Sequence, residues 1–410
     1  MRHPLLLALA LTAASAPAQW QILDAHTTAD LRGIDNIGKG IVWASGTNGT
    51  VLRSENAGSL WQHCTIPPGA EHLDFRGIQA FDANTAIVMS SGKGDLSRLY
   101  ETTDGCQTWK LLFTNPDKDG FWDALVVQKG LGLLIGDPVA NRFQIYGAED
   151  AALEKWQRIG ETSSLRSFRF DLDAYPGETL FAASNSVLRG SPVQGFIFVS
   201  GGILGSKFSL ASEQRQTPDG GASYMSFKSS IPVAKGDTSG AFSLGAANQS
   251  MTHFGELVAV GGNYAMPDEG HGISAWSKDG GQHWKASKTQ PHGYRSAVAY
   301  DDPTKTWITV GPNGTDISTD DGHNWHPLKP DPKSGDQPDA DQHWNALSLP
   351  YAVGPHGRIG FLRPDALSPR PNNGVAHPFA RFAKGRGIVC GRKRPLSSTP
   401  PHQPVILSEA

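Results

Sequence analysis

Three arginines occupy the same position in three similar segments of the chain. The segments are Leu31-Arg-Gly-Ile34, Phe75-Arg-Gly-Ile78 and Tyr294-Arg-Ser-Ala297. A guanidinium binds a carboxylate through two parallel hydrogen bonds, so Arg32, Arg76 and Arg295 are candidates for anchoring an acidic group if the fold gathers them. Tyr264, Asp137 and Asp268 are expected on neighbouring loops. The alternative is that carboxylates of the protein itself, such as Asp123, neutralise the three arginines.

The arginine segments belong to a set of seven strand starts. Each start is followed by a second strand that ends in glycine. If the starts are the innermost strands of a ring of sheets, the second residue of each start faces the central axis. That predicts an axial ring made of Arg32, Arg76, Asp123, Ala182, Phe242, Arg295 and Asn345.

A turn motif recurs five times, as Ser/Thr-x-Asp/Asn-x-Gly-x-x-Trp/Tyr with small variations. The first copy is Ser54 to Trp61 and the last is Ser318 to Trp325. The Asp or Asn side chain can accept backbone N–H bonds in the turn, and glycine supplies the positive φ. The expected structural residues are Asn56, Gly58, Trp61, Asp104, Trp109, Asp219, Tyr224, Asp279, Gly281, Trp284, Asp320, Gly322 and Trp325.

Four strands that recur at this spacing predict an all-β fold, a seven-bladed β-propeller. The third blade has lost the motif and keeps only Trp156. The seventh blade lacks a fourth strand, and the segment Trp20 to Leu23 resembles the fourth strands that begin at Trp61 and Trp109. The N-terminal strand is therefore expected to complete the last blade and close the ring, which leaves no free sheet edge there.

The recurring turns resemble Asp-box (BNR) repeats such as those of sialidases. The order of the segments, including Gly136-Asp-Pro-Val139 and Gly293-Tyr-Arg-Ser-Ala297, resembles bacterial relatives of the photosystem II stability/assembly factor over residues 20–362. This resemblance implies a seven-bladed propeller in the periplasm or thylakoid lumen. It also implies an assembly scaffold that binds a protein or peptide, which could be a subunit of a membrane complex.

The competing hypothesis is an enzyme. It would be a sialidase-like glycoside hydrolase, another carbohydrate-binding enzyme or an oxidoreductase. Sialidases combine an arginine triad with a Tyr nucleophile and a Glu partner, and Tyr264 and Glu178 are the candidates here. The chain lacks the Arg-Ile-Pro segment typical of those enzymes. We predict no catalytic residue, no metal and no cofactor, because no nucleotide loop, nucleophile elbow or metal-binding spacing stands in a suitable context.

Both ends of the chain differ from the repeats. The run Leu5 to Ala14 follows a basic start and precedes Ala16 and Ala18, which predicts a signal peptide over residues 1–18 and an exported protein, periplasmic or extracellular. The propeller is expected over 19–362 and a basic, Pro-rich disordered tail over 363–410. The formal net charge of -3 argues against nucleic acid as a partner, and no stretch is long enough to span a membrane.

The three cysteines, Cys64, Cys106 and Cys390, cannot all pair. A bridge between Cys64 and Cys106 requires them to lie on adjacent repeats. Because three scattered thiols are no disulfide framework, we expect two unpaired, half-buried thiols at these positions.

Overall fold

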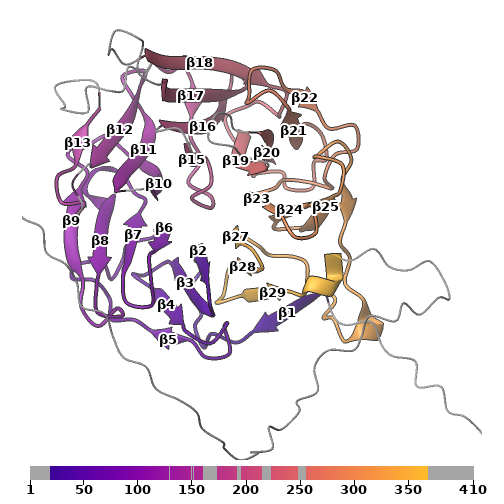
Figure 1. Cartoon of the computed structure of the whole chain (residues 1–410), viewed down its shortest axis with the longest axis horizontal. Coiled ribbons are helices and arrows are strands. Elements are labelled where there is room, and N and C mark those ends of the chain that lie inside the picture. The colour runs from indigo at the N-terminus through magenta and orange to yellow at the C-terminus, as the bar shows by residue number, and fades with distance from the viewer. Residues whose placement is uncertain are drawn as a thin grey trace, which may run out of the picture. The chain divides into compact units, whose positions relative to one another are not determined.

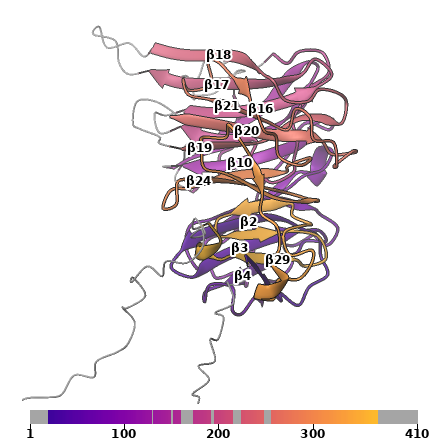
Figure 2. The same cartoon turned by 90° about the vertical axis from the view of Figure 1, so that its right-hand side faces the viewer.

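The computed structural model describes residues 19–128, 130–148, 150, 152–159, 173–191, 195–214, 223–247 and 255–367. The predicted signal peptide, the Asp-box residue Asp219 and almost all of the predicted tail lie outside these residues. The regular structure is almost entirely antiparallel β, which confirms the all-β prediction. The strands form a β-propeller, whose innermost strands surround the centre in Figure 1 and whose sheets stack around it in Figure 2.

Five of the described sheets have four strands each. They consist of β2 (Leu31–Gly38), β3 (Ile41–Gly46), β4 (Val51–Ser54) and β5 (Gln62–His63); β6 (Phe75–Ala80), β7 (Ala86–Ser90), β8 (Arg98–Thr102) and β9 (Lys110–Thr114); β10 (Trp122–Gln128), β11 (Leu131–Val139), β12 (Arg142–Ala148) and β13 (Gln157–Arg158); β23 (Ala297–Asp301), β24 (Thr306–Gly311), β25 (Gly314–Ser318) and β26 (His326–Pro327); and β27 (Ala346–Ser348), β28 (Tyr351–Val353), β29 (Ile359–Leu362) and β1 (Trp20–Leu23). Three short 3-10 turns, η1 (Gly94–Leu96), η2 (Pro332–Ser334) and η3 (Pro364–Leu367), lie between or after them.

The remaining strands form one sheet of nine strands. They are β14 (Glu178–Thr179), β15 (Leu188–Ser191), β16 (Gly195–Gly202), β17 (Ser206–Gln214), β18 (Ser223–Ile231), β19 (Ser239–Ala247), β20 (Glu256–Asn263), β21 (Ser274–Ser277) and β22 (Lys285–Ala286). A single pair, Gly201 with Gly240, connects β16 to β19. A Cβ added at Gly201 would lie 2.5 Å from the Cα of Gly240, so only glycine permits this approach. The five four-stranded sheets and this sheet give seven blades only if the nine strands are counted as two blades. The number of seven blades therefore stays a prediction.

The N-terminal strand closes the ring, as the Trp20 segment predicted. β1 pairs antiparallel with β29, with Trp20 opposite Leu362 and Leu23 opposite Ile359. The indole of Trp20 is buried and lies 5.1 Å from that of Trp344 between ring centroids. The two ends of the propeller are therefore joined by both a hydrogen-bonded ladder and an aromatic contact.

The predicted strand starts are partly wrong. Those at Leu31, Phe75, Trp122 and Ala241 lie within β2, β6, β10 and β19. The residues Phe181 to Ser184 form no strand, and the innermost strand there, β15, begins at Leu188. The starts at Tyr294 and Trp344 are extended segments that precede β23 and β27.

Side chains of the innermost strands join neighbouring sheets near the axis. The Gln79 amide accepts a hydrogen bond from Val127 N at 2.6 Å and donates to Val127 O at 2.8 Å. Asp35 accepts one from Ala80 N at 2.8 Å, and Asn345 donates one to Leu31 O at 2.8 Å. Buried backbone groups at the sheet boundaries are satisfied in this way without a shared ladder.

Four Asp-box turns have the same hydrogen bonds. In the last copy the Ser318 hydroxyl donates to Asp320 at 2.8 Å and accepts from Gly322 N at 3.1 Å, while Asn324 N donates to Asp320 at 2.9 Å. The equivalent bonds hold the turns at Asn56, Asp104 and Asp279. The glycine position has φ between 78° and 90° at Gly58, Gly281 and Gly322, in agreement with the predicted role of the motif.

The third blade keeps a variant of the turn that its sequence concealed. Asp150 accepts hydrogen bonds from Glu154 N and Lys155 N, both at 2.9 Å. Leu153 takes the left-handed conformation with a φ of 51°, and the Trp156 indole donates to Leu153 O at 2.7 Å. The prediction that this blade keeps only Trp156 from the motif was therefore incomplete, because Asp150 also takes the place of the motif's aspartate.

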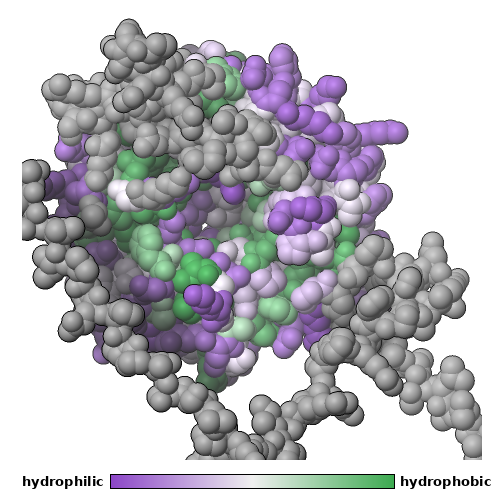
Figure 3. Space-filling model, viewed as in Figure 1, coloured by the Kyte–Doolittle hydropathy of each residue, from purple (hydrophilic) through white to green (hydrophobic). Residues whose placement is uncertain are grey.

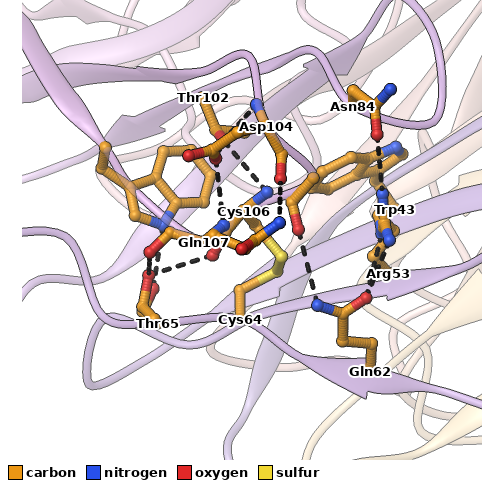
Figure 4. Close-up of a disulfide and its surroundings, with 12 residues drawn as sticks. Trp43, Arg53, Gln62, Cys64, Thr65, Asn84, Thr102, Asp104, Cys106 and Gln107 are labelled. Atoms are coloured by element: carbon orange, nitrogen blue, oxygen red, sulfur yellow. Dashed lines mark hydrogen bonds between the residues drawn. A yellow bond between two sulfur atoms is a disulfide. The ribbon is translucent and has the colours of Figure 1, made fainter.

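The prediction of unpaired thiols at Cys64 and Cys106 was wrong. The two residues form a disulfide across neighbouring sheets, and their Cα atoms lie 5.2 Å apart (Figure 4). Cys106 replaces the glycine of its Asp box and has a φ of 63°. The other boxes bring this glycine against the preceding sheet, where a Cβ at Gly322 would meet Val258 at 2.8 Å and one at Gly58 would meet Leu23 at 2.8 Å. At the same position, Cys106 is joined to the preceding sheet by the disulfide bond.

We expect the variant Cys64→Ser to be less stable than the wild type by about 2–4 kcal/mol, because the bridge closes a loop of 42 residues in the unfolded chain. Urea unfolding with and without dithiothreitol measures this difference. Reductant should destabilise the wild type by a similar amount and leave Cys64→Ser unchanged. Equal stability of the oxidised wild type and the variant would contradict the prediction.

Asp35 makes stability depend on pH, because burial raises its pKa to about 6 while the hydrogen bond from Ala80 lowers it only in part. The folded state therefore binds the proton more tightly than the unfolded state, and stability falls as pH rises from about 4 to about 6. Asp35→Asn, which keeps the acceptor for Ala80 N–H, should be more stable than the wild type at pH 7.5 by roughly 1–3 kcal/mol. Thermal unfolding should show the two proteins converging near pH 4, and a constant difference across this range would refute the assignment.

Candidate functional site

A cavity of about 490 Å³ lies at the axis of the propeller. Six of the seven predicted ring residues line it, and Figure 3 shows hydrophobic and hydrophilic residues side by side around the centre of the ring. The lining residues from the predicted ring are Arg32, Arg76, Asp123, Ala182, Phe242 and Asn345. The positions of the strand starts therefore predicted six of the residues that line this cavity.

The cavity lies toward one end of the propeller. Asp137, Tyr264 and Pro312 line it, and each stands at or just after the glycine-rich end of a second strand. The Asp boxes join the third strand of a sheet to the fourth and therefore lie at the opposite end. The residues of the cavity and the box residues thus occupy different faces.

Arg32 contributes a guanidinium that the described part of the protein does not neutralise. Its Nε is buried, and no hydrogen bond or ion pair to it is found among the described residues. The described residues give this guanidinium no carboxylate partner, so its positive charge is available to an anion in the cavity. Arg32 is thus the residue most suited to hold an anion.

Arg76 is partly satisfied within the protein. Its Nε donates to Asp74 at 2.8 Å, and one terminal nitrogen donates to Ala182 O at 3.2 Å. The Asp74 carboxylate offsets one of the two positive charges at the cavity. Arg76 is therefore paired with Asp74, whereas Arg32 has no ion pair among the described residues.

Asp123 and Asp137 were candidate partners of the arginines, and both line the cavity. Burial raises the pKa of Asp123 well above its usual range, and the charge of Asp137 raises it further, while Arg76 lowers it. Burial also raises the pKa of Asp137, partly offset by hydrogen bonds from Thr179 and Leu180 N. One oxygen of Asp123 has no hydrogen-bond partner among the described residues, so the protonated form could donate a hydrogen bond there.

Aromatic side chains also line the cavity, and Tyr294 lies close enough to Arg32 and Arg76 to interact with their charges. Phe242 stacks on Phe181 with 3.8 Å between ring centroids, and Tyr294 meets the same ring edge-on at 4.8 Å. Tyr264 lies 6.1 Å from Phe242 and is 51% exposed at the margin. The sequence analysis selected Tyr264 but missed Phe181 and Tyr294 as lining residues, although both begin strand-start segments.

Arg295 is not in the cavity, so its predicted anchoring role is wrong in geometric terms. Its side chain is fully buried and forms an ion pair with Asp316, to which Nε donates at 2.9 Å. It also donates to Asn313 at 2.6 Å, and His292 binds the other oxygen of Asp316 at 2.9 Å. The side chain turns away from the axis because Asp316 and Asn313 follow β24 within reach of it.

The other two selected acids also lie away from the cavity. Asp268 is exposed and accepts a hydrogen bond from Asn313 at 3.2 Å. Glu178 is buried, where it accepts hydrogen bonds from Tyr175 N at 2.8 Å and from the Ser200 hydroxyl. Glu178 does not line the cavity, so the Tyr264 and Glu178 pair that a sialidase-like reaction requires is not assembled.

Two further observations bear on metals and membranes. Among the residues with defined positions, no group of three or more His, Cys, Asp or Glu side chains could hold a metal ion. None of the helices in the described segments has the length and apolar character of a membrane span.

No protein-family model matches the chain, and no curated protein matches it in sequence. Many solved structures resemble it, and two of them are matched over their whole length. The structure titled "YCF48 bound to D1 peptide" has a TM-score of 0.54 at 18% identity and covers 87% of this chain and 100% of its own. YCF48 from Cyanidioschyzon merolae has a TM-score of 0.55 at 14% identity and covers 85% of this chain and 100% of its own. A GH74 xyloglucanase from Xanthomonas campestris has a TM-score of 0.32 at 17% identity, with 72% of this chain and 47% of the enzyme covered.

The buried pair Arg295 and Asp316 gives a test of the structural role. Burial raises the pKa of Asp316, but the hydrogen bond from His292 and the charge of Arg295 outweigh this and lower it. The pair therefore stabilises the fold at neutral pH, and its contribution is lost as pH falls below the usual carboxyl range. Asp316→Asn should lower the free energy of unfolding at pH 7 by about 3–5 kcal/mol, because it leaves a buried guanidinium uncompensated.

Chemical denaturation at pH 7 measures this loss. Asp339→Asn is a matched control, because Asp339 pairs with Arg358 at 3.4 Å at a site where its own carboxylate is 47% exposed. The control should change stability by less than about 1 kcal/mol. Similar losses in the two variants would show that the buried cluster has no special role.

Proposed function

We propose that this protein is an exported β-propeller scaffold that binds a peptide segment of another protein in its axial cavity. The observation that carries the proposal is that Arg32 lines the cavity while its guanidinium forms no ion pair with the described residues. Arg76 adds a second guanidinium that is only partly neutralised. A carboxylate of the partner, from an acidic side chain or a chain end, would complete this arrangement.

The aromatic part of the cavity favours a peptide over a small anion. Phe242 and Tyr294 offer apolar ring surface in the same cavity as the guanidiniums, so a ligand with an apolar side chain near its carboxylate would contact both kinds of group. Rings of this kind contribute strongly to binding because they bury a large area with few rotatable bonds. A cavity of about 490 Å³ accommodates a few side chains and not a folded domain.

The comparison with solved structures supports a protein partner. One of the similar propellers was determined with a peptide of D1 bound to it. By analogy, we infer a role in the assembly or stability of a protein complex for this chain, and a subunit of a membrane complex is the partner class that fits best. The fold likeness adds support to the argument from Arg32 and does not replace it.

Export is the second part of the proposal. The run Leu5 to Ala14 and the small residues that follow it have the pattern of a signal peptide. The disulfide between Cys64 and Cys106 agrees with an oxidising compartment, because such bonds persist mainly outside the cytosol. We therefore assign the protein to the periplasm or the extracellular space.

The proposal predicts that Arg32→Ala combined with Arg76→Ala weakens peptide binding. A fluorescein-labelled octapeptide rich in glutamate and phenylalanine, with a free C-terminal carboxylate, serves as the probe in an anisotropy titration. Loss of two charge-assisted contacts should raise Kd by about tenfold to a hundredfold. The wild-type Kd should also rise with salt concentration.

Arg53→Ala is the matched control, because Arg53 pairs with Glu55 on the face that carries the Asp boxes. Its Kd should equal that of the wild type. Affinity capture of partners from the host cell, with the same three proteins, tests whether the cavity acts on a natural partner. Equal recovery of every partner by the wild type and the double variant would overturn the proposal.

A further inference from the structure

One hairpin presents two aliphatic side chains to solvent. Ile203 and Leu204 form the turn between β16 and β17 and are 49% and 54% exposed. The flanking Gly202 and Gly205 have positive φ values of 116° and 89°, which lets the chain reverse tightly here. The result is an exposed apolar tip that does not line the axial cavity.

The tip is held in place by the loop before β14. A Cβ at Gly177 would lie 2.6 Å from the side chain of Ile203, so this loop packs closely on the hairpin. Next to it stands Tyr175, which is 48% exposed. The ammonium groups of Lys207 and Lys228 lie 5.3 and 5.6 Å from its ring centroid. We call Tyr175, Ile203, Leu204 and Lys207 the apolar tip patch.

The patch lies on the same face as the cavity. Ile203 follows the second strand of its sheet, as Tyr264 and Pro312 follow theirs. Glu178 and Thr179 pair with Gly202 and Gly201 at the base of the hairpin, and Leu180 directly after them lines the cavity. Other exposed apolar side chains at the ends of strands on this face are Leu96, Tyr264 and Met266.

We propose that the apolar tip patch docks on a lipid bilayer that contains anionic headgroups. Aliphatic side chains on a convex turn can enter the boundary between headgroups and acyl chains, Tyr is enriched at that depth, and Lys is attracted by anionic lipid. A protein partner would favour a different composition, because Lys is depleted in the core of protein interfaces. Lys235 lies beside Gly205, and Asp237 two residues later offsets its charge, so Lys207 provides the main attraction.

Docking in this way turns the mouth of the cavity toward the bilayer. A segment that emerges from a membrane protein close to the lipid surface is then the ligand best placed to enter. This orientation rests on the proposed function, whereas lipid binding by the patch does not. The two proposals can therefore fail separately.

The test is flotation of the full chain with large unilamellar vesicles. One set contains phosphatidylcholine only, and the other contains phosphatidylcholine with 30% phosphatidylglycerol. The wild type should float with the anionic vesicles, and Ile203→Ser combined with Leu204→Ser should reduce the bound fraction about tenfold. The basic segment after residue 363 is present in every protein compared, so the difference reports the patch alone.

Two single variants keep the test decisive. Leu204→Ser changes a side chain that is 54% exposed and should by itself lower binding severalfold, even if the double variant folds poorly. Leu60→Ser changes an apolar residue that is 73% exposed in an Asp-box turn on the opposite face, and should bind vesicles like the wild type. Equal flotation of the wild type and Leu204→Ser, or no flotation of the wild type with anionic vesicles, would overturn the proposal. Peptide binding without lipid should be unchanged in all three variants.

Discussion

The structure depends on how closely each sheet can approach the one before it. At the Asp-box turns this approach is so tight that the facing position has no room for an ordinary side chain. At Gly281 a Cβ would meet the ring of Phe208 at 2.3 Å, and at Gly322 it would meet Val258 at 2.8 Å. The Asp or Asn of the motif fixes the turn so that its glycine faces the neighbour. Since all sheets stand in a ring, a displacement at one boundary must be absorbed at the others.

The inner ends of the strands use polar contacts for the same purpose. Gln79, Asp35 and Asn345 each bind backbone of the adjacent sheet, so the innermost strands are held in register around the axis. This rigidity has a consequence for the cavity. The strand of Arg32 is held on both sides, so the backbone of this residue is fixed beside the cavity that its side chain lines. A rigid ring therefore maintains a binding group in a state that is unfavourable without a ligand.

Much of the fold was predictable because its signals are local and repeated. The Asp boxes predicted the turns, and the match between Trp20 and the fourth strands predicted the closure of the ring. The second residues of the strand starts predicted six residues of the cavity. The prediction was wrong for Arg295, because its guanidinium binds Asp316 and Asn313 instead. The start motif contains no information about these two partners. The disulfide was missed for a related reason. Its signal was Cys106 at the glycine position of a box, which is informative only once that position is known to touch the preceding sheet.

The departures from the repeat, and not the repeat itself, give this propeller its specific properties. Equivalent positions around the axis hold Arg32, Ala182 and Phe242, so the cavity combines cationic and aromatic side chains. A fully regular ring would place the same residue at every position, and seven guanidiniums at one axis would repel one another strongly in a medium of low polarity. Variation among the repeats is therefore required for a stable site with two kinds of surface. The same holds for the hairpin at Ile203, where one sheet extends an apolar turn beyond the common pattern on the face that carries the cavity.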